Sequence, residues 1–465
     1  MTIWQPDISK RSGSRYIAIA DALGDDILTG ALKAGVKLPT HRDLAYRLGV
    51  TVGTVSRAYA EAERRGLVAG EVGRGTFVRE GAESEYDPGF AIRAAEETGC
   101  IEMGLNFPAL CGSDVLLADA LADLSRTNNL VDLIQYQPDV GVAAHREAGA
   151  QFIRSNGIGA DAENVVVSAG VQHAISVLCT ILARPGDLVL TEAHTYPGIM
   201  VAAQHLHLRI QGLPMDEEGI LPDAVDEACR HGGARILYVT PTLHNPTTAV
   251  MSEKRRRDLA EVARKHQLFI LEDDVYSFLD QSHPPPLAAF APERCFYMCS
   301  ASKAFAPGLR VGFILAPPGF TAQVGAGIRA SVWMAPPLMA EIAARWIMDG
   351  TSDTLKKRHV QEVRVRQELA HKILGADVIG PSNPAAYHIW LQLPEPWRAD
   401  EFAAHAKARN IHVIAAETFA ASRVYSPHAV RLCLGGVRTC ERLEQGLRAI
   451  ADTLNERPRM RTAVI

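Results

Sequence analysis

Apolar positions repeat at helical spacing in three stretches of the first eighty residues. The first stretch is marked by Tyr16, Ile17, Ala20, Leu23, Ile27 and Leu28. The second begins at the N-cap Thr40 and ends at Gly49, and the third begins at the N-cap Thr51 and ends at Gly66. Two short helices joined by such a tight turn are typical of a helix-turn-helix. Strand-like runs at 67–70 and 76–78 flank a glycine turn and predict a wing.

From about residue 99 onward, short apolar runs alternate with helical stretches. The runs lie at 165–167, 188–190, 235–239, 268–271, 295–298 and 311–315. Strands that alternate with helices predict an α/β fold in which helices cover both faces of a mostly parallel sheet. Ligands of such sheets bind at the carboxyl ends of the strands, so we expect the chemistry in the loops that follow these runs.

Residues 81–98 separate the two regions, are acidic and show no sustained apolar period. We therefore predict a winged helix over 10–80, a linker over 81–98 and a large domain over 99–465. Fully extended, the linker reaches roughly 60 Å. That length permits the N-terminal head to lie on a partner subunit, so that two subunits could exchange heads.

The composition is that of a soluble globular protein, with 47% hydrophobic and 22% charged residues among 465. The eight cysteines are sparse, and neither they nor His194, His205, His207 and His244 have the spacing of a metal site. No apolar run is long enough to span a bilayer, and the first residues lack the features of a signal peptide. These observations predict a cytoplasmic protein without a membrane partner or a bound metal.

Charge distinguishes the head from the rest of the chain. Residues 10–80 contain twelve Lys and Arg against eight Asp and Glu, a net charge of +4, whereas the whole chain carries −5. A local excess of positive charge points to nucleic acid, here double-stranded operator DNA. In a helix-turn-helix the second of the paired helices enters the major groove, which would present Thr51, Thr54, Ser56 and Arg57 to DNA. Arg42 and Arg74 would meet phosphates.

The loops after the predicted strands carry a set of reactive side chains. Gly170, Val171 and Gln172 open a helix, where free N–H groups suit a phosphate. Other strands are followed by Asn245, by Asp273 and Tyr276, and by the segment that holds Ser300, Ser302, Lys303 and Arg310. A lysine at a strand end can bond to an aldehyde cofactor, and a nearby carboxylate can keep a pyridine nitrogen protonated. Pyridoxal 5′-phosphate is the cofactor with both groups.

This order of motifs resembles the fold-type I aminotransferases of class I and II over residues 99–465, which implies a smaller C-terminal α+β subdomain. The resemblance implies that Lys303 forms the Schiff base, Asp273 pairs with the pyridine nitrogen, and Asn245 and Tyr276 bind the phenolic oxygen. It also implies a stacking role for Tyr196 and a carboxylate-binding role for Arg431. The implied phosphate ligands are Gly170, Val171, Gln172, Ser300, Ser302, Arg310 and, from the neighbouring subunit of a homodimer, Tyr136. Val171, Thr248 and the pair Ala385-Ala386 depart from the family pattern, in which a hydroxyl, a glycine and a glycine pair are common.

A winged helix of the GntR type joined to an aminotransferase-like domain resembles the MocR subfamily of bacterial transcription regulators. The resemblance implies a regulator that senses an amino acid, a related amine or pyridoxal phosphate, with activation and repression both open. An alternative is a catalytically active aminotransferase for an α-amino acid with an accessory DNA-binding head, because Lys303, Asp273, Asn245, Tyr276 and Arg431 are also what transamination needs.

Overall fold

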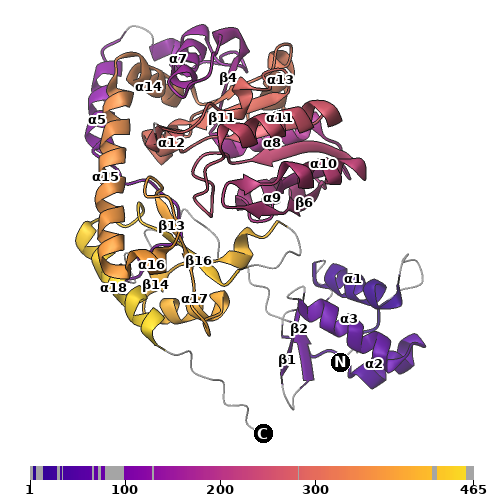
Figure 1. The fold of residues 1–465 in the computed structure, drawn as a ribbon. Coiled ribbons are helices and arrows are strands. Elements are labelled where there is room, and N and C mark those ends of the chain that lie inside the picture. The colour runs from indigo at the N-terminus through magenta and orange to yellow at the C-terminus, as the bar shows by residue number, and fades with distance from the viewer. Residues whose placement is uncertain are drawn as a thin grey trace. The chain divides into compact units, whose positions relative to one another are not determined.

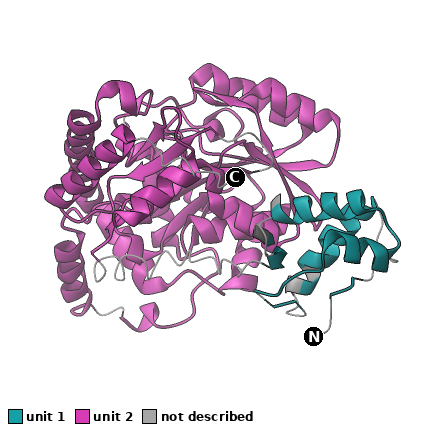
Figure 2. Cartoon of the chain, turned by 90° about the horizontal axis from the view of Figure 1, so that it is seen from below, with its two compact units in different colours: residues 1–93 teal, residues 94–465 magenta. Residues whose placement is uncertain are grey.

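The computed structural model describes residues 4–6, 14–28, 32–33, 35–64, 67–71, 75–78, 99–127, 130–280, 282–421 and 427–456. The chain divides into two compact units, residues 1–93 and 94–465 (Figure 2). The expected linker at 81–98 and the wing residue Arg74 lie outside the described residues. No described helix is long and apolar enough to cross a membrane.

In the first unit, called the head below, the described residues form three helices and a hairpin (Figure 1). These elements are α1 (Arg15–Leu28), α2 (His41–Leu48), α3 (Val52–Arg64), β1 (Val68–Glu71) and β2 (Gly75–Val78). Thr40 caps α2 by accepting a hydrogen bond from Asp43 N at 3.2 Å, and Gly49 ends it in the left-handed region at φ 62°. Ile19, Leu23 and Leu44 are fully buried between the helices. The predicted helix-turn-helix with a wing is confirmed.

A seven-stranded sheet forms the main lobe of the second unit, with the order β4-β12-β11-β10-β9-β5-β6. The strands are β4 (Val165–Ser168), β5 (Leu188–Glu192), β6 (Arg209–Leu213), β9 (Ala234–Val239), β10 (Phe269–Asp273), β11 (Cys295–Ser300) and β12 (Gly312–Leu315). β12 is antiparallel to both of its neighbours, and the other pairs are parallel. All six predicted runs are strands of this sheet, so the α/β prediction is confirmed.

Helices cover both faces of the sheet, because its residues alternate between two apolar cores. Val165 and Val167 belong to one core, and Val166 belongs to the other. The helices of this lobe are α5 (Ser113–Leu124), α6 (Leu130–Leu133), α7 (Ala143–Arg154), α8 (Val171–Leu182), α9 (Pro197–His205), α10 (Pro222–Arg230), α11 (Glu253–His266), α12 (Ala301–Ala304), α13 (Thr321–Ser331) and α14 (Pro337–Met348). Short 3-10 turns are η1 (Ala162–Asn164), η2 (Ser277–Leu279), η3 (Leu287–Ala289) and η4 (Pro307–Leu309).

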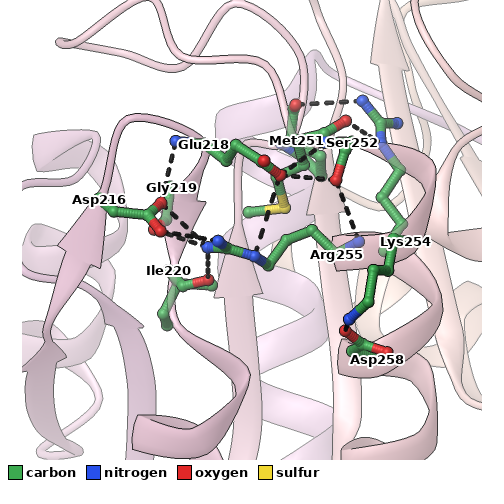
Figure 3. Close-up of polar contacts among 11 residues, drawn as sticks. Asp216, Glu218, Gly219, Ile220, Met251, Ser252, Lys254, Arg255 and Asp258 are labelled. Atoms are coloured by element: carbon green, nitrogen blue, oxygen red, sulfur yellow. Dashed lines mark hydrogen bonds and ion pairs between the residues drawn. The ribbon is translucent and has the colours of Figure 1, made fainter.

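The hairpin of β7 (Met215–Asp216) and β8 (Gly219–Ile220) is fixed to the start of α11 by Arg255 (Figure 3). The Arg255 guanidinium donates to both Asp216 carboxylate oxygens, at 3.0 and 2.7 Å. Ser252, the N-cap of α11, donates to Glu218 Oε2 at 2.6 Å. The ion pair lowers the pKa of Asp216, because the Arg255 hydrogen bond favours the charged carboxylate.

A smaller lobe follows the long helix α15 (Thr351–Leu374), which extends from the main lobe into it (Figure 1). Its sheet has the order β13-β16-β15, and β3 pairs in parallel with β14 from the other end of the unit. The remaining elements are β3 (Ile101–Glu102), α16 (Ala376–Ile379), β13 (His388–Gln392), α17 (Ala399–Ala408), β14 (Ile411–His412), β15 (Ile414–Ala415), η5 (Ala416–Phe419), β16 (Ala429–Cys433) and α18 (Cys440–Asn455). The predicted C-terminal α+β subdomain is confirmed, and β3 adds the start of the unit to it.

Candidate functional sites

Lys303 lies in the short helix α12, immediately after β11 at the carboxyl end of the sheet. Ser300 begins this helix by accepting a hydrogen bond from Ser302 N at 2.9 Å. The Lys303 ammonium donates to the backbone carbonyl of Asn106, which is 197 positions away in the chain. Burial lowers the pKa of Lys303 to about 8. A lysine with that pKa releases its proton much closer to neutral pH than an ordinary lysine does, which favours the nucleophilic amine.

Asp273, the last residue of β10, is almost completely buried at 5% exposure. Its Oδ2 accepts a hydrogen bond from Tyr238 at 2.6 Å, whereas its Oδ1 has no hydrogen-bond partner among the described residues. Burial raises the pKa of Asp273 to about 7, against the lowering effect of the Tyr238 hydrogen bond. A buried carboxylate with one free oxygen is suited to a cationic N–H donor.

Arg431, on β16 of the smaller lobe, reaches across to the main lobe. Its guanidinium donates to Asn245 Oδ1 and to the carbonyl of Gly104, both at 2.6 Å, and lies over the ring of Phe419 at 4.7 Å. The side chain is buried, and Nε has no hydrogen-bond partner in the part of the chain that is described. The hydrogen bonds described for this cation therefore end on neutral oxygens.

Backbone from two loops and the Arg310 guanidinium meet at the start of α8. Gly170, with φ 87°, precedes α8, and a Cβ on it would come within 2.6 Å of Arg310 Nη2. Arg310 also donates to Ser302 Oγ at 3.3 Å. The first N–H groups of α8, beginning at Val171, are available to an anion at this end of the helix. This geometry forms a cradle for a phosphate-sized group.

Not every predicted ligand points into this cradle. The amide of Gln172 donates to the carbonyl of Gly198 at 3.0 Å, and the hydroxyl of Ser300 donates to Val311 O at 3.2 Å. Tyr196 is half-buried at the start of α9. Tyr136 is 81% exposed, and its ring packs against Trp333 with centroids 5.6 Å apart. Tyr136 is thus a surface residue of this subunit.

Asn106 belongs to the site, although the sequence analysis did not single it out. Its side-chain amide donates to the Tyr276 hydroxyl at 2.9 Å and contacts His388 Nδ1 at 3.2 Å. Its backbone carbonyl accepts from Lys303. Nothing in the periodicity around residue 106 indicates this position, because its partners come from three distant segments.

Thr248, which stands where the family commonly has a glycine, also has a backbone conformation that favours glycine. Thr248 adopts φ 65°, the left-handed region that favours glycine, and is buried. Its hydroxyl accepts a hydrogen bond from Asn383 N at 2.8 Å. The threonine thus links the loop that carries Asn245 to the smaller lobe.

The head presents three of its predicted DNA contacts directly to solvent. Arg42 on α2, Arg57 on α3 and Thr51 just before α3 are exposed, whereas Thr54 and Ser56 are half-buried. Thr51 and Thr54 share a hydrogen bond at 2.9 Å, and Thr51 also accepts from Thr54 N at 3.2 Å, as a helix cap does. The Ser56 hydroxyl is bonded to His41 Nδ1 at 3.1 Å, between the two helices.

The sequence profile described as "Aminotransferase class I and II" matches residues 98–450. The chain belongs to this family. The profile described as "Bacterial regulatory proteins, gntR family" matches residues 15–78. Together they confirm the architecture that the sequence predicted, a GntR-type helix-turn-helix joined to an aminotransferase class I and II domain.

Curated relatives that match most of the chain are named as regulators. The chain is 31% identical to the uncharacterized HTH-type transcriptional regulator YdeF of Bacillus subtilis (strain 168), over 97% of each chain. It is 25% identical to the HTH-type transcriptional regulator TauR of Rhodobacter capsulatus, over 86% of this chain and 88% of TauR. These similarities support the MocR-type resemblance.

Solved structures of aminotransferases share the fold of this family member. An archaeal alanine:glyoxylate aminotransferase superimposes with a TM-score of 0.72 at 23% identity, covering 85% of this chain and 98% of that enzyme. The kynurenine aminotransferase of Pyrococcus horikoshii, solved with PMP, gives a TM-score of 0.71 at 21% identity, covering 79% of this chain and 94% of that enzyme.

Proposed function

We propose that this protein is a pyridoxal phosphate-dependent transcription regulator whose aminotransferase-like domain senses an amino-type effector. The free Oδ1 of Asp273, the glycine cradle at Gly170 and the half-buried Lys303 fit the ring nitrogen, the phosphate and the aldehyde of this cofactor. Pyridoxal phosphate supplies an aldehyde carbon that reacts with primary amines and a ring that withdraws electrons. These residues therefore match both the phosphate end and the aldehyde end of the cofactor.

Each part of the cofactor has a set of residues to hold it. Lys303 would attach to the aldehyde carbon, Asp273 would keep the ring nitrogen protonated, and Asn245 and Tyr276 would donate to the phenolic oxygen. Tyr196 would stack on the ring. The phosphate would be bound by the remaining predicted ligands, Gly170, Val171, Gln172, Ser300, Ser302 and Arg310. Because the side chains of Gln172 and Ser300 are engaged elsewhere, we expect these two to contribute through their backbone or after a rotamer change.

Arg431 indicates the chemistry of the effector. A buried guanidinium whose described partners are neutral carries an unneutralised charge, which is costly in a protein interior. A carboxylate provides the missing charge and a two-pronged contact. An amino acid offers both this carboxylate and an amine for the aldehyde, so an α-amino acid is the effector class that the site favours.

The head is the single observation that favours regulation over catalysis alone. Exposed Arg42 and Arg57 lie on the two helices of a GntR-type helix-turn-helix, as expected for phosphate and base contacts with operator DNA. An effector changes DNA occupancy only if it binds the two states of the protein with different affinity. We place the protein in the cytoplasm, where bacterial operator DNA is found.

Transamination of an α-amino acid is the second candidate function. It is favoured by Lys303, because an amine with a pKa of about 8 can accept and return a proton near neutral pH. The two functions are compatible in one chain, since a sensor and a transaminase need the same first contacts with an amino acid.

A homodimer completes the proposal. Large apolar side chains are exposed around α5 and α6, among them Leu110 at 61%, Val115 at 62% and Ile134 at 84%, and in the loop before α14, where Trp333 is 54% exposed and packs against Tyr136. Exposed apolar surface of this kind is typical of a protein interface. A second copy on this face would also explain the exposed Tyr136, which we expect to reach the partner's phosphate site.

Purified full-length protein loaded with pyridoxal phosphate tests these functions. We would titrate it with a panel of amino acids, record the cofactor spectrum, assay keto acids, and measure binding to the DNA upstream of its own gene. A regulator gives an amino acid-dependent change in DNA affinity without turnover. Keto-acid release with unchanged DNA affinity would favour the aminotransferase, and failure to take up the cofactor would overturn the cofactor assignment.

A further inference from the structure

A cavity of about 390 Å³ lies next to η2, the turn that follows the strand ending at Asp273. It is lined by the turn after α7, by η2, by the loop at 283–285 and by the first turns of α15. Its lining residues are Ser155, Asn156, Gly157, Ser277, Phe278, His283, Pro285, Asp353 and Lys356. None of them is a predicted ligand of the cofactor, and the volume lies within the usual range for small-molecule sites.

Lys356 supplies a positive charge to the wall of this cavity. Its side chain is only 14% exposed, and its ammonium donates to Ser155 Oγ at 2.8 Å and lies 4.5 Å from the centroid of the Phe152 ring. An ammonium has three donors, and one of them is used in this hydrogen bond. Burial lowers the pKa of Lys356, so the charge is poorly solvated where it lies. An anion bound in the cavity would compensate for the water that the Lys356 ammonium has lost.

Ser277 supplies an unpartnered hydroxyl. The residue is 2% exposed, and its Oγ has no hydrogen-bond partner among the described residues. Leaving a buried hydroxyl without a partner is unfavourable, and a bound acceptor would relieve that cost. His283 adds a ring nitrogen, because its Nδ1 donates to Pro284 O at 2.8 Å and leaves Nε2 for a ligand.

The carboxylates near the cavity are either hydrogen-bonded within the protein or at its rim. Asn156, which is 5% exposed, donates to Tyr297 at 2.9 Å, and Tyr297 donates to Asp274 Oδ2 at 2.7 Å. Asp274 Oδ1 accepts from Ser277 N at 3.2 Å. Asp353 lies 3.8 Å from the Lys356 ammonium and is 68% exposed. The buried carboxylate is therefore satisfied from within the protein, and only the rim carboxylate competes for Lys356.

We propose that this cavity is a second ligand site, separate from the cofactor site, for a small organic anion with a carboxylate or phosphate group. A partly desolvated ammonium with the Ser277 hydroxyl in the same cavity wall binds such oxygens more strongly than surface lysines do, because the surrounding dielectric is low. The hydrogen-bond chain through Asn156, Tyr297 and Asp274 joins this site to the residue next to Asp273. A bound anion would thus contact α15 directly and be linked through these hydrogen bonds to the strand end that holds Asp273.

Titration calorimetry on the full-length protein loaded with pyridoxal phosphate tests the site, since the cofactor fills the phosphate cradle. Inorganic phosphate and pyruvate are the probes, at constant ionic strength. We expect saturable binding of at least one probe, and which of them binds identifies phosphate or carboxylate as the recognised group. Lys356→Met should raise the Kd at least tenfold, and Ser277→Ala should raise it severalfold.

Lys357→Met is the matched control, because it removes an exposed lysine from the same helix and should leave the Kd unchanged. Asp353→Asn should lower the Kd by removing the competing carboxylate, and it remains informative if Lys356→Met does not fold. The absence of saturable binding by either probe, or binding that Lys356→Met and Asp353→Asn leave unchanged, would overturn the proposal.

Discussion

In the head, Arg42 and Arg57, which we expect to meet DNA, are exposed on two consecutive helices that a short turn joins. In the large unit, Lys303, Asp273 and Arg431 come from distant segments and are held by partners such as Asn106, Tyr238 and Asn245. Short-range order is enough to display a cation on a helix. Tertiary packing is required to lower the pKa of Lys303 and raise that of Asp273, because burial is the main cause of both shifts.

Lys303→Ala is the strongest test of the contrast between the exposed head and the buried site of the large unit. We expect complete loss of the covalent link to pyridoxal phosphate, because Lys303 is the lysine that directly follows β11 at the carboxyl end of the sheet. Cofactor absorbance and the mass of the protein after borohydride reduction report the link. DNA binding without effector should persist, since the head does not use this residue. An unchanged spectrum would remove Lys303 from the site, and Lys357→Ala is the control.

Leu44→Ala should have the opposite effect, because it should disrupt the head and leave the cofactor site intact. Leu44 is fully buried in the head, and truncating a buried leucine costs about 2–5 kcal/mol, a large share of the stability of so small a domain. We expect the head to unfold and DNA binding to disappear while the cofactor spectrum is retained. Loss of both would show that the units depend on each other. Tyr46→Ala removes a 90% exposed side chain from the same helix and should leave the stability of the head unchanged.

The pH dependence of stability without cofactor should reveal the cost of burying Asp273. Its pKa of about 7 lies above its ordinary value, so the folded state keeps the proton longer than the unfolded state does. The stability that this group contributes is therefore lost as pH rises from about 4 through 7. Relative to wild type, Asp273→Asn should become more stable over this window, by at most about 1.4 kcal/mol per pH unit.

Chemical denaturation of both proteins at several pH values measures this difference. Asp216→Asn is the contrasting variant, because Arg255 lowers the pKa of Asp216 and its contribution is lost as pH falls below the ordinary range of aspartate. Parallel pH profiles for wild type and Asp273→Asn would contradict the burial argument.

The smallest of these effects is expected from Arg57→Ala. If Arg57 contacts bases, its loss should cost about 1–3 kcal/mol of operator binding and reduce the preference for operator over random DNA. Arg42→Ala should instead weaken both kinds of DNA similarly and reduce the salt dependence of binding. Lys33→Ala removes an equal charge outside the helix-turn-helix and controls for net charge. Equal affinity of Arg57→Ala and wild type at matched salt would contradict the placement of α3 in the groove.

The sequence determined the element order of this protein. Helix caps such as Thr40 and stops such as Gly49 act within a few residues, and the six apolar runs became strands because each is long and apolar enough to be buried on both faces. Motif spacing also identified Lys303, Asp273, Asn245 and Tyr276 as neighbours, because the carboxyl ends of parallel strands share one edge of the sheet.

Only the tertiary structure decided the partners of these residues. Asn106 and Gly104 reach the site because β3 pairs with β14, a contact between segments 310 positions apart. The hydrogen bond of Ser56 to His41, and the Ser277 hydroxyl that lacks a partner among the described residues, likewise depend on how separate elements pack. Local sequence fixes which residues form a helix or strand, whereas desolvation and hydrogen-bond pairing depend on every group that the folded chain brings within a few ångströms.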